Sequence, residues 1–257
     1  MYALITGASS GIGKEFARLL ARKKMDLILV ARRLDRLETL KEELETKYHI
    51  TVILKQCDLS EEANCQKLFE DCKPYPIGVL INNAGFGKTG RFDRIPLEDE
   101  LSMIQTNVIA LHVLTKLFAS HMNKGYILNV SSIAGHVPVP IMATYGATKA
   151  YVLSLTQSVN YEMRKLNKPI YLSALCPGPV DTEFNQVAGA DFNLSSITPK
   201  QCAAEGLRGL FQKKPVIFPA KSTNILSKLS KFTPMKALLP IEYEIQTRKL
   251  DKDQYDL

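Results

Sequence analysis

The chain has 257 residues, 46% of them hydrophobic, and a formal net charge of +7 at pH 7. These values fit one α/β domain with a sizeable core. A basic balance can indicate nucleic-acid binding, but no basic stretch is interleaved with aromatic residues, so we expect no nucleic-acid partner. No apolar run reaches the roughly 20 residues that span a bilayer, which predicts no transmembrane helix. An apolar strand follows Met1 directly, which predicts no signal peptide.

The cysteine pattern argues against disulfides and metal. The chain has five cysteines, an odd number, and no C-x-x-C pair: Cys57, Cys65, Cys72, Cys176 and Cys202. Such a set is typical of reduced thiols in a cytoplasmic protein rather than of a disulfide framework or a zinc site. We therefore expect no metal and a cytoplasmic location.

Strand-length apolar runs alternate with segments of helical period over residues 1–220. The predicted strands are 2–6, 27–31, 52–56, 79–82, 126–131, 170–175 and 216–219. The predicted helices are 11–23, 34–47, 63–72, 98–122 and 144–165, and a further one begins at Thr198-Pro199. Six of the strands are continuously apolar, as in sheets covered on both faces. The pattern predicts a single α/β domain, Rossmann-like, with a doubly wound parallel sheet of about seven strands.

Two segments depart from this alternation. Residues 180–197 lack a clear period and read as a long loop or small lid. Residues 221–257 form a C-terminal extension, which we expect to pack on the same domain or on a neighbouring subunit. Its apolar residues are interleaved with Lys221, Lys228, Lys231 and Lys236, so contact with a membrane surface stays a less favoured alternative.

The first strand leads directly into a glycine-rich turn, residues 6–13, with the sequence TGASSGIG. Gly7 permits a tight turn, Gly11 lets the backbone approach a pyrophosphate, and Gly13 allows close packing of helix on strand. The N-terminus of the following helix offers unpaired N–H groups to phosphate. This strand–turn–helix setting predicts a dinucleotide site.

The end of the second strand distinguishes NADP from NAD. NAD-binding folds usually place an acid there for the ribose 2′-hydroxyl, whereas this chain has Arg32 and Arg33. A guanidinium binds a 2′-phosphate through forked donors. We expect NADPH/NADP as cofactor, with Arg32 on the phosphate and Ser9 or Ser10 nearby; either arginine alone could instead be an ordinary surface charge.

Tyr145 and Lys149 lie four residues apart on a predicted helix and so share one face. A lysine close to a phenol favours the phenolate and lowers its pKa, which is about 10 when unperturbed. The pair predicts a general acid/base for carbonyl chemistry. Ser132, at the end of the fifth strand, lies where doubly wound sheets bind their ligands.

The motifs together resemble those of the short-chain dehydrogenase/reductase family. The matching elements are TGASSGIG at 6–13, Asp58, NNAG at 82–85, Asn107, Ser132, YGATK at 145–149 and PGPVDT at 177–182. They occur in the family's order over roughly residues 1–220. The resemblance is specific to the family and not to a substrate.

The resemblance implies roles for individual residues. Tyr145 is expected to donate a proton to the substrate oxygen, Lys149 to lower the Tyr145 pKa and hold the nicotinamide ribose, and Ser132 to bind the substrate oxygen. Asn107 is expected to hold a water that links Lys149 to a proton relay. Other cofactor contacts are expected from Ile12, Asp58, Leu59, Asn83, Ala84, Gly85, Pro177, Gly178, Val180 and Thr182.

We therefore expect an NADPH-dependent oxidoreductase that reduces an apolar ketone or aldehyde to the alcohol, with a small-molecule carbonyl or alcohol substrate. Residues 137–142, which are mainly apolar, suggest the apolar preference. A homodimer or homotetramer follows from the resemblance. Two alternatives stay open: a non-catalytic NADP(H)-binding regulator, and a membrane-surface reductase of lipid carbonyls.

Overall fold

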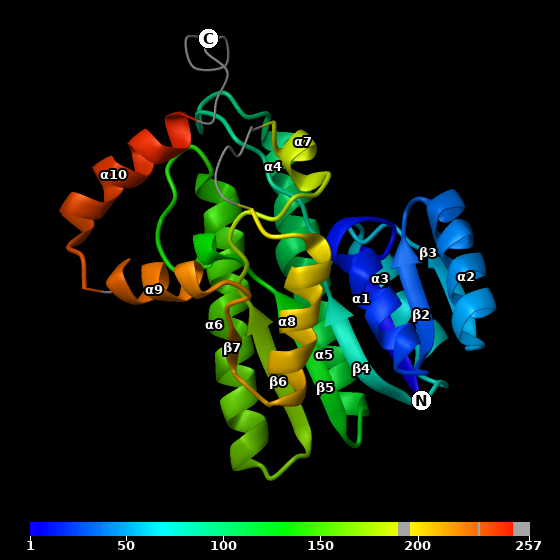
Figure 1. The fold of residues 1–257 in the computed structure, drawn as a ribbon. Coiled ribbons are helices and arrows are strands. Elements are labelled where there is room, and N and C mark those ends of the chain that lie inside the picture. The colour runs from blue at the N-terminus through cyan, green and yellow to red at the C-terminus, as the bar shows by residue number, and fades with distance from the viewer. Residues whose placement is uncertain (190–195, 231, 249–257) are drawn as a thin grey trace.

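The computed structural model describes residues 1–189, 196–230 and 232–248 and contains one parallel sheet (Figure 1). The strand order is β3-β2-β1-β4-β5-β6-β7. The strands are β1 (Tyr2–Thr6), β2 (Asp26–Ala31), β3 (Val52–Gln56), β4 (Ile77–Asn82), β5 (Gly125–Val130), β6 (Ile170–Leu175) and β7 (Val216–Ile217). The order reverses between β1 and β4, the switch point at which such sheets bind ligands. The predicted doubly wound fold is confirmed, with β7 shorter than expected.

Helices cover both faces of the sheet. One face carries α1 (Gly11–Arg22), α2 (Leu34–Tyr48) and α8 (Pro199–Phe211), and the other carries α3 (Glu62–Cys72), α5 (Leu111–His121) and α6 (Ala143–Lys165). The N-terminus of α8 matches its prediction, because the Thr198 hydroxyl accepts a hydrogen bond from Gln201 N at 3.1 Å. Such a cap contributes about 1 kcal/mol to stability.

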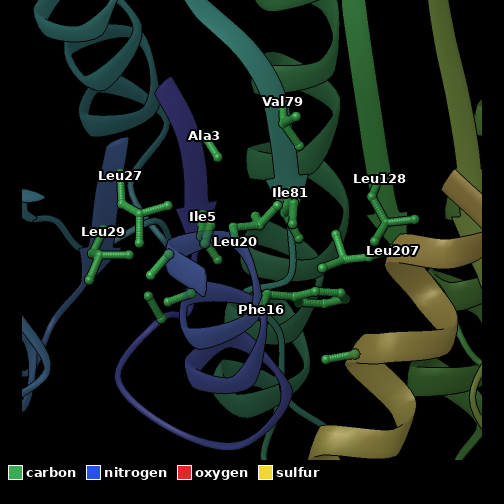
Figure 2. Close-up of a cluster of buried hydrophobic side chains, with 14 of the residues drawn as sticks. Ala3, Ile5, Phe16, Leu20, Leu27, Leu29, Val79, Ile81, Leu128 and Leu207 are labelled. Atoms are coloured by element: carbon green, nitrogen blue, oxygen red, sulfur yellow. The ribbon is translucent and has the colours of Figure 1, made fainter. Parts of the chain in front are cut away.

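Alternate strand residues point into two separate cores. Ile5 of β1 and Ile81 of β4 face Phe16 of α1 in the core under α1 and α8, as Figure 2 shows. Leu4, next to Ile5 in β1, enters the opposite core with Phe118 of α5. All five side chains are fully buried, and burying each contributes roughly 1.5–3 kcal/mol. The sheet that carries the strand ends is therefore anchored from both sides.

The helix predicted over 98–122 is interrupted. The structure has α4 (Leu97–Ile104), a π-helical segment η1 (Gln105–Ala110) and α5 in its place. The Asn107 side chain lies in η1 and bonds the backbone of Phe86 with both its atoms, Nδ2 to O at 2.8 Å and Oδ1 from N at 3.0 Å. Single π-helical turns inside α-helices occur often at functional sites.

The same stretch, Leu97–His121, is long and apolar enough to cross a membrane by length and composition, and an 18-residue window within it has a mean hydropathy of 1.3. Core helices of globular domains meet those two criteria as well. Leu111, Leu114 and Phe118 of this stretch are buried against the sheet. The expectation that no segment could cross a membrane is thus not met by length and composition, although the part of the stretch in α5 packs in the core.

The two segments that departed from the sequence pattern contain helices. Residues 180–189 include α7 (Phe184–Ala188), and Val180 pairs with Ile197 in an isolated parallel bridge; residues 190–195 lie outside the described part of the chain. The extension forms α9 (Lys221–Ser230) and α10 (Met235–Thr247), for which the sequence analysis predicted no elements. In Figure 1, both lie on the side of the domain away from α2 and β3.

Candidate active site

The predicted site residues gather at the carboxyl ends of β1, β4, β5 and β6. The glycine turn follows β1, residues 83–85 follow β4, Ser132 follows β5, and the 177–182 segment follows β6. Because all seven strands are parallel, these ends meet along one edge of the sheet. The fold therefore brings together residues that are up to 175 positions apart in the sequence.

The glycine turn is held against the end of β4. Asn83 Nδ2 donates to Thr6 O at 3.0 Å and to Gly7 O at 3.1 Å, and Thr6 Oγ1 accepts from Asn83 N at 3.0 Å. Gly7 and Gly11 have φ of +66° and +52°, in the left-handed region that favours glycine. A Cβ on Gly13 would collide with Gly7 O. The roles predicted for Gly7 and Gly13 agree with this geometry.

This turn fits a dinucleotide phosphate group. Ser10 occupies the N-cap position of α1, but its side chain makes no capping hydrogen bond. The first N–H groups of α1 thus have no side-chain acceptor from Ser10. They lie at the positive end of the helix and can bind an anion. A Cβ on Gly11 would lie 3.2 Å from Thr182 Cγ2, so the 177–182 segment approaches the turn closely. Gly7, Gly11, Ser10, Ile12 and Thr182 would hold the pyrophosphate region.

Arg33, rather than Arg32, reaches the serines of the turn. Arg33 Nη2 donates to Ser10 Oγ at 2.9 Å and to Ser9 Oγ at 3.2 Å. Arg32 instead lies near Asp58, where burial alone would raise the pKa of the carboxyl, but hydrogen bonds from Ser60 and the charge of Arg32 lower it overall. The geometry therefore favours Arg33 for a 2′-phosphate, whereas the sequence analysis favoured Arg32.

Tyr145 and Lys149 are buried on α6, with exposed fractions of 8% and 4%. Lys149 Nζ donates to Val130 O at 2.9 Å and lies 5.7 Å from the centroid of the Tyr145 ring. Burial raises the pKa of Tyr145 to about 12. A hydrogen bond with Ser132 lowers this pKa, but its effect is the smaller of the two. Burial lowers the pKa of Lys149 to about 8.

The expectation that Lys149 lowers the Tyr145 pKa stays a prediction, because burial is the larger influence on the pKa of both groups in this structure. The spacing does place both side chains on one face of α6, as predicted. Nζ donates to a backbone carbonyl of β5 and lies 5.7 Å from the centroid of the Tyr145 ring. Desolvation, which disfavours the charged form of each group, therefore dominates. At neutral pH this keeps Tyr145 protonated.

Ser132 and Asn107 complete the predicted catalytic set. In addition to its contact with Tyr145, Ser132 Oγ accepts a hydrogen bond from Ala134 N at 3.1 Å. Asn107 Oδ1 and Lys149 Nζ both face Gly85, since a Cβ there would lie 2.8 and 3.3 Å from them. The four predicted residues, including Tyr145, are brought to one place by β5, η1 and α6.

The surroundings of Tyr145 are apolar. Met103, Val139 and Met142 pack with Tyr145 in a small cluster, and Phe86, Ala134, Val137 and Phe184 pack against it. The Phe184 ring lies 5.4 Å from the Tyr145 ring, centroid to centroid. Ile141 has a φ of +67°, unusual for a β-branched residue, and its carbonyl accepts from Gly90 N at 2.9 Å. The predicted apolar wall at 137–142 does border the site.

Sequence reasoning missed several side chains that shape the site. Ser131 Oγ, directly after β5, donates to Lys149 O of α6 at 2.7 Å. Asn107 Nδ2 also donates to Thr148 Oγ1 at 3.2 Å. Glu183 pairs with Arg33 and with Arg36 of α2. Ser131 and Glu183 each adjoin a motif residue and Thr148 lies inside the YGATK motif, but none of these positions reveals its hydrogen-bond or ion-pair partner from the sequence.

The model of the short chain dehydrogenase family matches residues 1–192. The chain belongs to the short-chain dehydrogenase/reductase family. It is 36% identical over 190 residues to a very-long-chain 3-oxoacyl-CoA reductase of Vanderwaltozyma polyspora, a match that covers 66% of this chain and 53% of that protein. The chain thus spans about half the length of that relative.

Two other relatives are covered more fully. The chain is 34% identical over 212 residues to dehydrogenase/reductase SDR family member 11 of Gallus gallus, covering 79% of this chain and 81% of the relative. It is 38% identical over 192 residues to an NADP-dependent 3-hydroxy acid dehydrogenase of Schizosaccharomyces pombe, covering 72% and 73%. These family members are oxidoreductases by name.

Solved structures agree with the fold. A short-chain dehydrogenase from Sphingobium yanoikuyae in complex with NADPH has a TM-score of 0.81 and 33% identity, covering 90% of this chain and 94% of that one. A bulky-bulky ketone specific alcohol dehydrogenase from Comamonas testosteroni has a TM-score of 0.77 and 31% identity, covering 90% and 92%. The predicted family and fold class are therefore confirmed.

Proposed function

We propose that the protein reduces an apolar ketone or aldehyde to the alcohol and uses NADPH as the reductant. The observation that carries the proposal is the buried position of Tyr145, in contact with Ser132 and surrounded by apolar side chains. A pKa of about 12 keeps the phenol in the form that can donate a proton to a carbonyl oxygen. The apolar neighbours favour a substrate without charge near its carbonyl.

Each catalytic residue has a task that its geometry permits. NADPH, when bound, would supply the hydride for the carbonyl carbon. Tyr145 donates its hydroxyl proton to the carbonyl oxygen, which Ser132 orients by a hydrogen bond. Lys149, with a pKa near 8, is the adjacent ammonium that can return a proton toward the phenolate. Asn107, fixed to Phe86 and beside Lys149 at Gly85, is placed to hold a relay water.

The preference for NADPH rests on Arg33 with Ser9 and Ser10, and on the lack of an acid directly after β2. The names of the yeast dehydrogenase and of the Sphingobium yanoikuyae complex include NADP and NADPH. A neighbour of the same fold from Burkholderia phymatum, 23% identical, is described in complex with NAD. The preference must therefore be measured directly.

The test is an NADPH-consumption screen over ketosteroids, 3-oxoacyl thioesters, retinoids, sugars and simple ketones, repeated with NADH. We expect turnover on at least one hydrophobic carbonyl, and NADPH binding at least about tenfold tighter than NADH binding, from a guanidinium–phosphate contribution of roughly 1.5–3 kcal/mol. Tight NADPH binding without turnover on any carbonyl would instead indicate a non-catalytic NADP(H)-binding regulator.

We also propose that two copies associate through the face formed by α4, η1 and α6. An open groove of about 470 Å³ on this face is lined mainly by apolar residues, among them Ile104, Val108 and Tyr151. Leu97 and Leu101 are exposed on the neighbouring α4. Light scattering should show a dimer or tetramer, and Leu101→Glu should shift it to monomer. Leu166→Glu, at another exposed leucine just beyond the end of α6, is the control.

The extension supports a second role, contact with an anionic membrane surface. On α9 and the following turn, Ile225, Leu229 and Phe232 are 59%, 61% and 87% exposed. No acidic residue occurs between Glu205 and Glu242, while lysines recur through this stretch. Two such basic surfaces would repel each other, whereas anionic lipid headgroups would attract them. The five free thiols fit a cytoplasmic location for this surface.

Vesicle sedimentation tests this role. We expect the protein to pellet with vesicles of phosphatidylglycerol and phosphatidylcholine, and not with phosphatidylcholine alone. Leu229→Ser with Phe232→Ser should abolish pelleting, whereas Leu166→Ser should not. Equal pelleting of the variant and the wild type would contradict the role of α9 and leave the extension as a packing element between subunits.

A further inference from the structure

Glu183 carries a carboxylate into the region that the cofactor phosphate needs. It directly follows Thr182 and precedes α7. Its Oε2 accepts from Arg33 Nη1 at 2.9 Å and its Oε1 from Arg36 Nη1 at 2.5 Å. Hydrogen bonds from Arg36 and from Arg33 lower the pKa of Glu183, so the group is ionised at neutral pH. One carboxylate thus lies between two guanidinium groups.

The same guanidinium of Arg33 has its other nitrogen on the serines of the glycine turn, Ser10 at 2.9 Å and Ser9 at 3.2 Å. We call Ser9, Ser10, Arg33 and Arg36 the phosphate cluster. The cluster carries two positive charges and two hydroxyls, the donor set that suits a phosphate. Among the described residues, Glu183 is the acid paired with these arginines.

Glu183 also belongs to the segment that covers the catalytic tyrosine. The next residue, Phe184, has its ring 5.4 Å from the ring of Tyr145, and a Cβ on Gly87 would lie 2.8 Å from Phe184 Cζ. The far end of α7 is tied down by a hydrogen bond from Thr89 N to Ala188 O at 2.9 Å. Consequently the position of Glu183 and the position of Phe184 are coupled through one peptide bond.

We propose that Glu183 is an internal counter-anion of the phosphate cluster, which a 2′-phosphate displaces from Arg33 and thereby repositions α7 over Tyr145. The proposal rests on the use of NADPH argued above. A carboxylate and a phosphate of charge about −1.5 to −2 repel each other at one guanidinium. The phosphate makes more charge-assisted hydrogen bonds than the carboxylate it replaces. Glu183 therefore lowers affinity for 2′-phosphates specifically and links cofactor recognition to the substrate side.

Calorimetric titration with two half-cofactors tests the competition. The ligands are adenosine 2′,5′-bisphosphate, which carries the 2′-phosphate, and adenosine 5′-monophosphate, which lacks it. Glu183→Gln should bind the bisphosphate at least about threefold more tightly than wild type does, with the monophosphate changed less than about twofold. Glu43→Gln is the matched control, because Glu43 also pairs with an arginine, Arg18 of α1, outside the cluster.

The sign of the change decides the outcome. Weaker binding of the bisphosphate by Glu183→Gln would mean that Glu183 holds Arg33 in its binding position, and unchanged binding would mean that the carboxylate does not compete. Either result overturns the proposal. If neither wild type nor variant binds the bisphosphate more tightly than the monophosphate, the preference for NADPH fails first, and the inference fails with it.

A tryptophan reporter tests the link to α7. The chain has no tryptophan, and Val187 of α7 is 50% exposed, so Val187→Trp places a single indole on this helix. Its emission should change when the bisphosphate binds and should not change with the monophosphate. In the Val187→Trp, Glu183→Gln protein, the emission should already differ without ligand, and the bisphosphate should add little. Calorimetric binding without any change in emission would overturn the coupling.

Discussion

The two ends of the site hold their charges in opposite ways. At the catalytic end, Tyr145 and Lys149 are buried, and desolvation sets their pKa values. At the phosphate end, the side chains of Arg33, Arg36 and Glu183 are 41–43% exposed and are balanced by mutual pairing. Exposed pairs are weak and salt-sensitive, whereas buried polar groups depend on fixed partners. Substitutions should therefore abolish chemistry at the first end and tune affinity at the second.

The largest effect is expected from Tyr145→Phe. This change removes only the hydroxyl that we propose as the proton donor, so turnover should fall by at least about 10²-fold, the low end of what general acid catalysis contributes. NADPH affinity should survive, because the ring still packs in the apolar cluster. Steady-state kinetics and fluorescence titration measure the two quantities.

Tyr151→Phe is the control for this change. Tyr151 lies on the same helix, is 39% exposed, and bonds His112 Nδ1 at 2.8 Å on the outer face. Its turnover should stay close to that of the wild type. Near wild-type turnover of Tyr145→Phe with bound cofactor would disprove the proposed acid and favour the regulator.

A smaller effect is expected at the phosphate end. Arg33→Ala should weaken NADPH binding by about 10-fold, from a charge-assisted contact of roughly 1.5–3 kcal/mol reduced by exposure, and should leave NADH binding nearly unchanged. Arg32→Ala should weaken NADPH binding less than Arg33→Ala does, because Arg32 lies near Asp58 whereas Arg33 contacts the serines of the glycine turn. The ratio of NADPH to NADH affinity should also shrink between 0.05 and 1 M salt, where the screening length drops to about 3 Å.

The reverse ranking, with Arg32→Ala the more damaging, would restore the expectation from sequence. The comparison is informative because both arginines follow β2 directly and differ only in where their side chains reach. The sequence shows that a basic residue stands where NAD-binding folds have an acid. It does not show which of two adjacent side chains turns toward the glycine turn.

The sheet and its motifs were predictable because each rests on a local pattern. Strands 2–6, 52–56 and 170–175 match the structure to the residue, since each begins with or consists mainly of an apolar run of strand length. Thr198-Pro199 marks the start of α8 by another local pattern, a capping residue followed by proline at the first helical position. Gly7 and Gly13 were also predictable, because a positive φ or a close backbone approach favours glycine over other residue types.

Features that depend on distant partners could not be predicted in this way. The π-helical segment around Asn107 is matched to the Phe86 backbone, 21 residues earlier. Glu183 finds Arg33 150 residues away. The pKa values of Tyr145 and Lys149 depend on burial, which four-residue spacing does not report. Helices α9 and α10 were missed because most of their apolar side chains are exposed and Pro240 lies inside α10.

The smallest effect, on stability, tests the buried end without any cofactor or substrate. Burial lowers the pKa of Lys149 from 10.5 to about 8, so below pH 8 the folded protein keeps a buried charge at a cost in stability. Between pH 8 and 10.5 the unfolded chain binds more protons at this residue, and its contribution to stability rises with pH. The buried thiols act in the opposite direction above pH 9, because burial raises the pKa of Cys72 to about 11 and that of Cys202 to about 12.

Comparison of wild type with Lys149→Met cancels the contribution of thiols that Lys149 does not influence, such as Cys72 and Cys202, and leaves that of Lys149 together with its effect on Cys176. The quantity of interest is the melting temperature of Lys149→Met minus that of wild type. This difference should be more favourable to the variant at pH 7 than at pH 10, and it should fall as pH rises from 8 to 10. Thermal denaturation followed by circular dichroism at half-unit steps measures this difference. Lys200→Met, which removes an exposed lysine of α8, should give a difference that does not vary over this range. If the difference for Lys149→Met does not vary with pH either, Lys149 is hydrated in solution. Desolvation would then not set the pKa of Lys149, and the two ends of the site would not differ in the way that their charges are held.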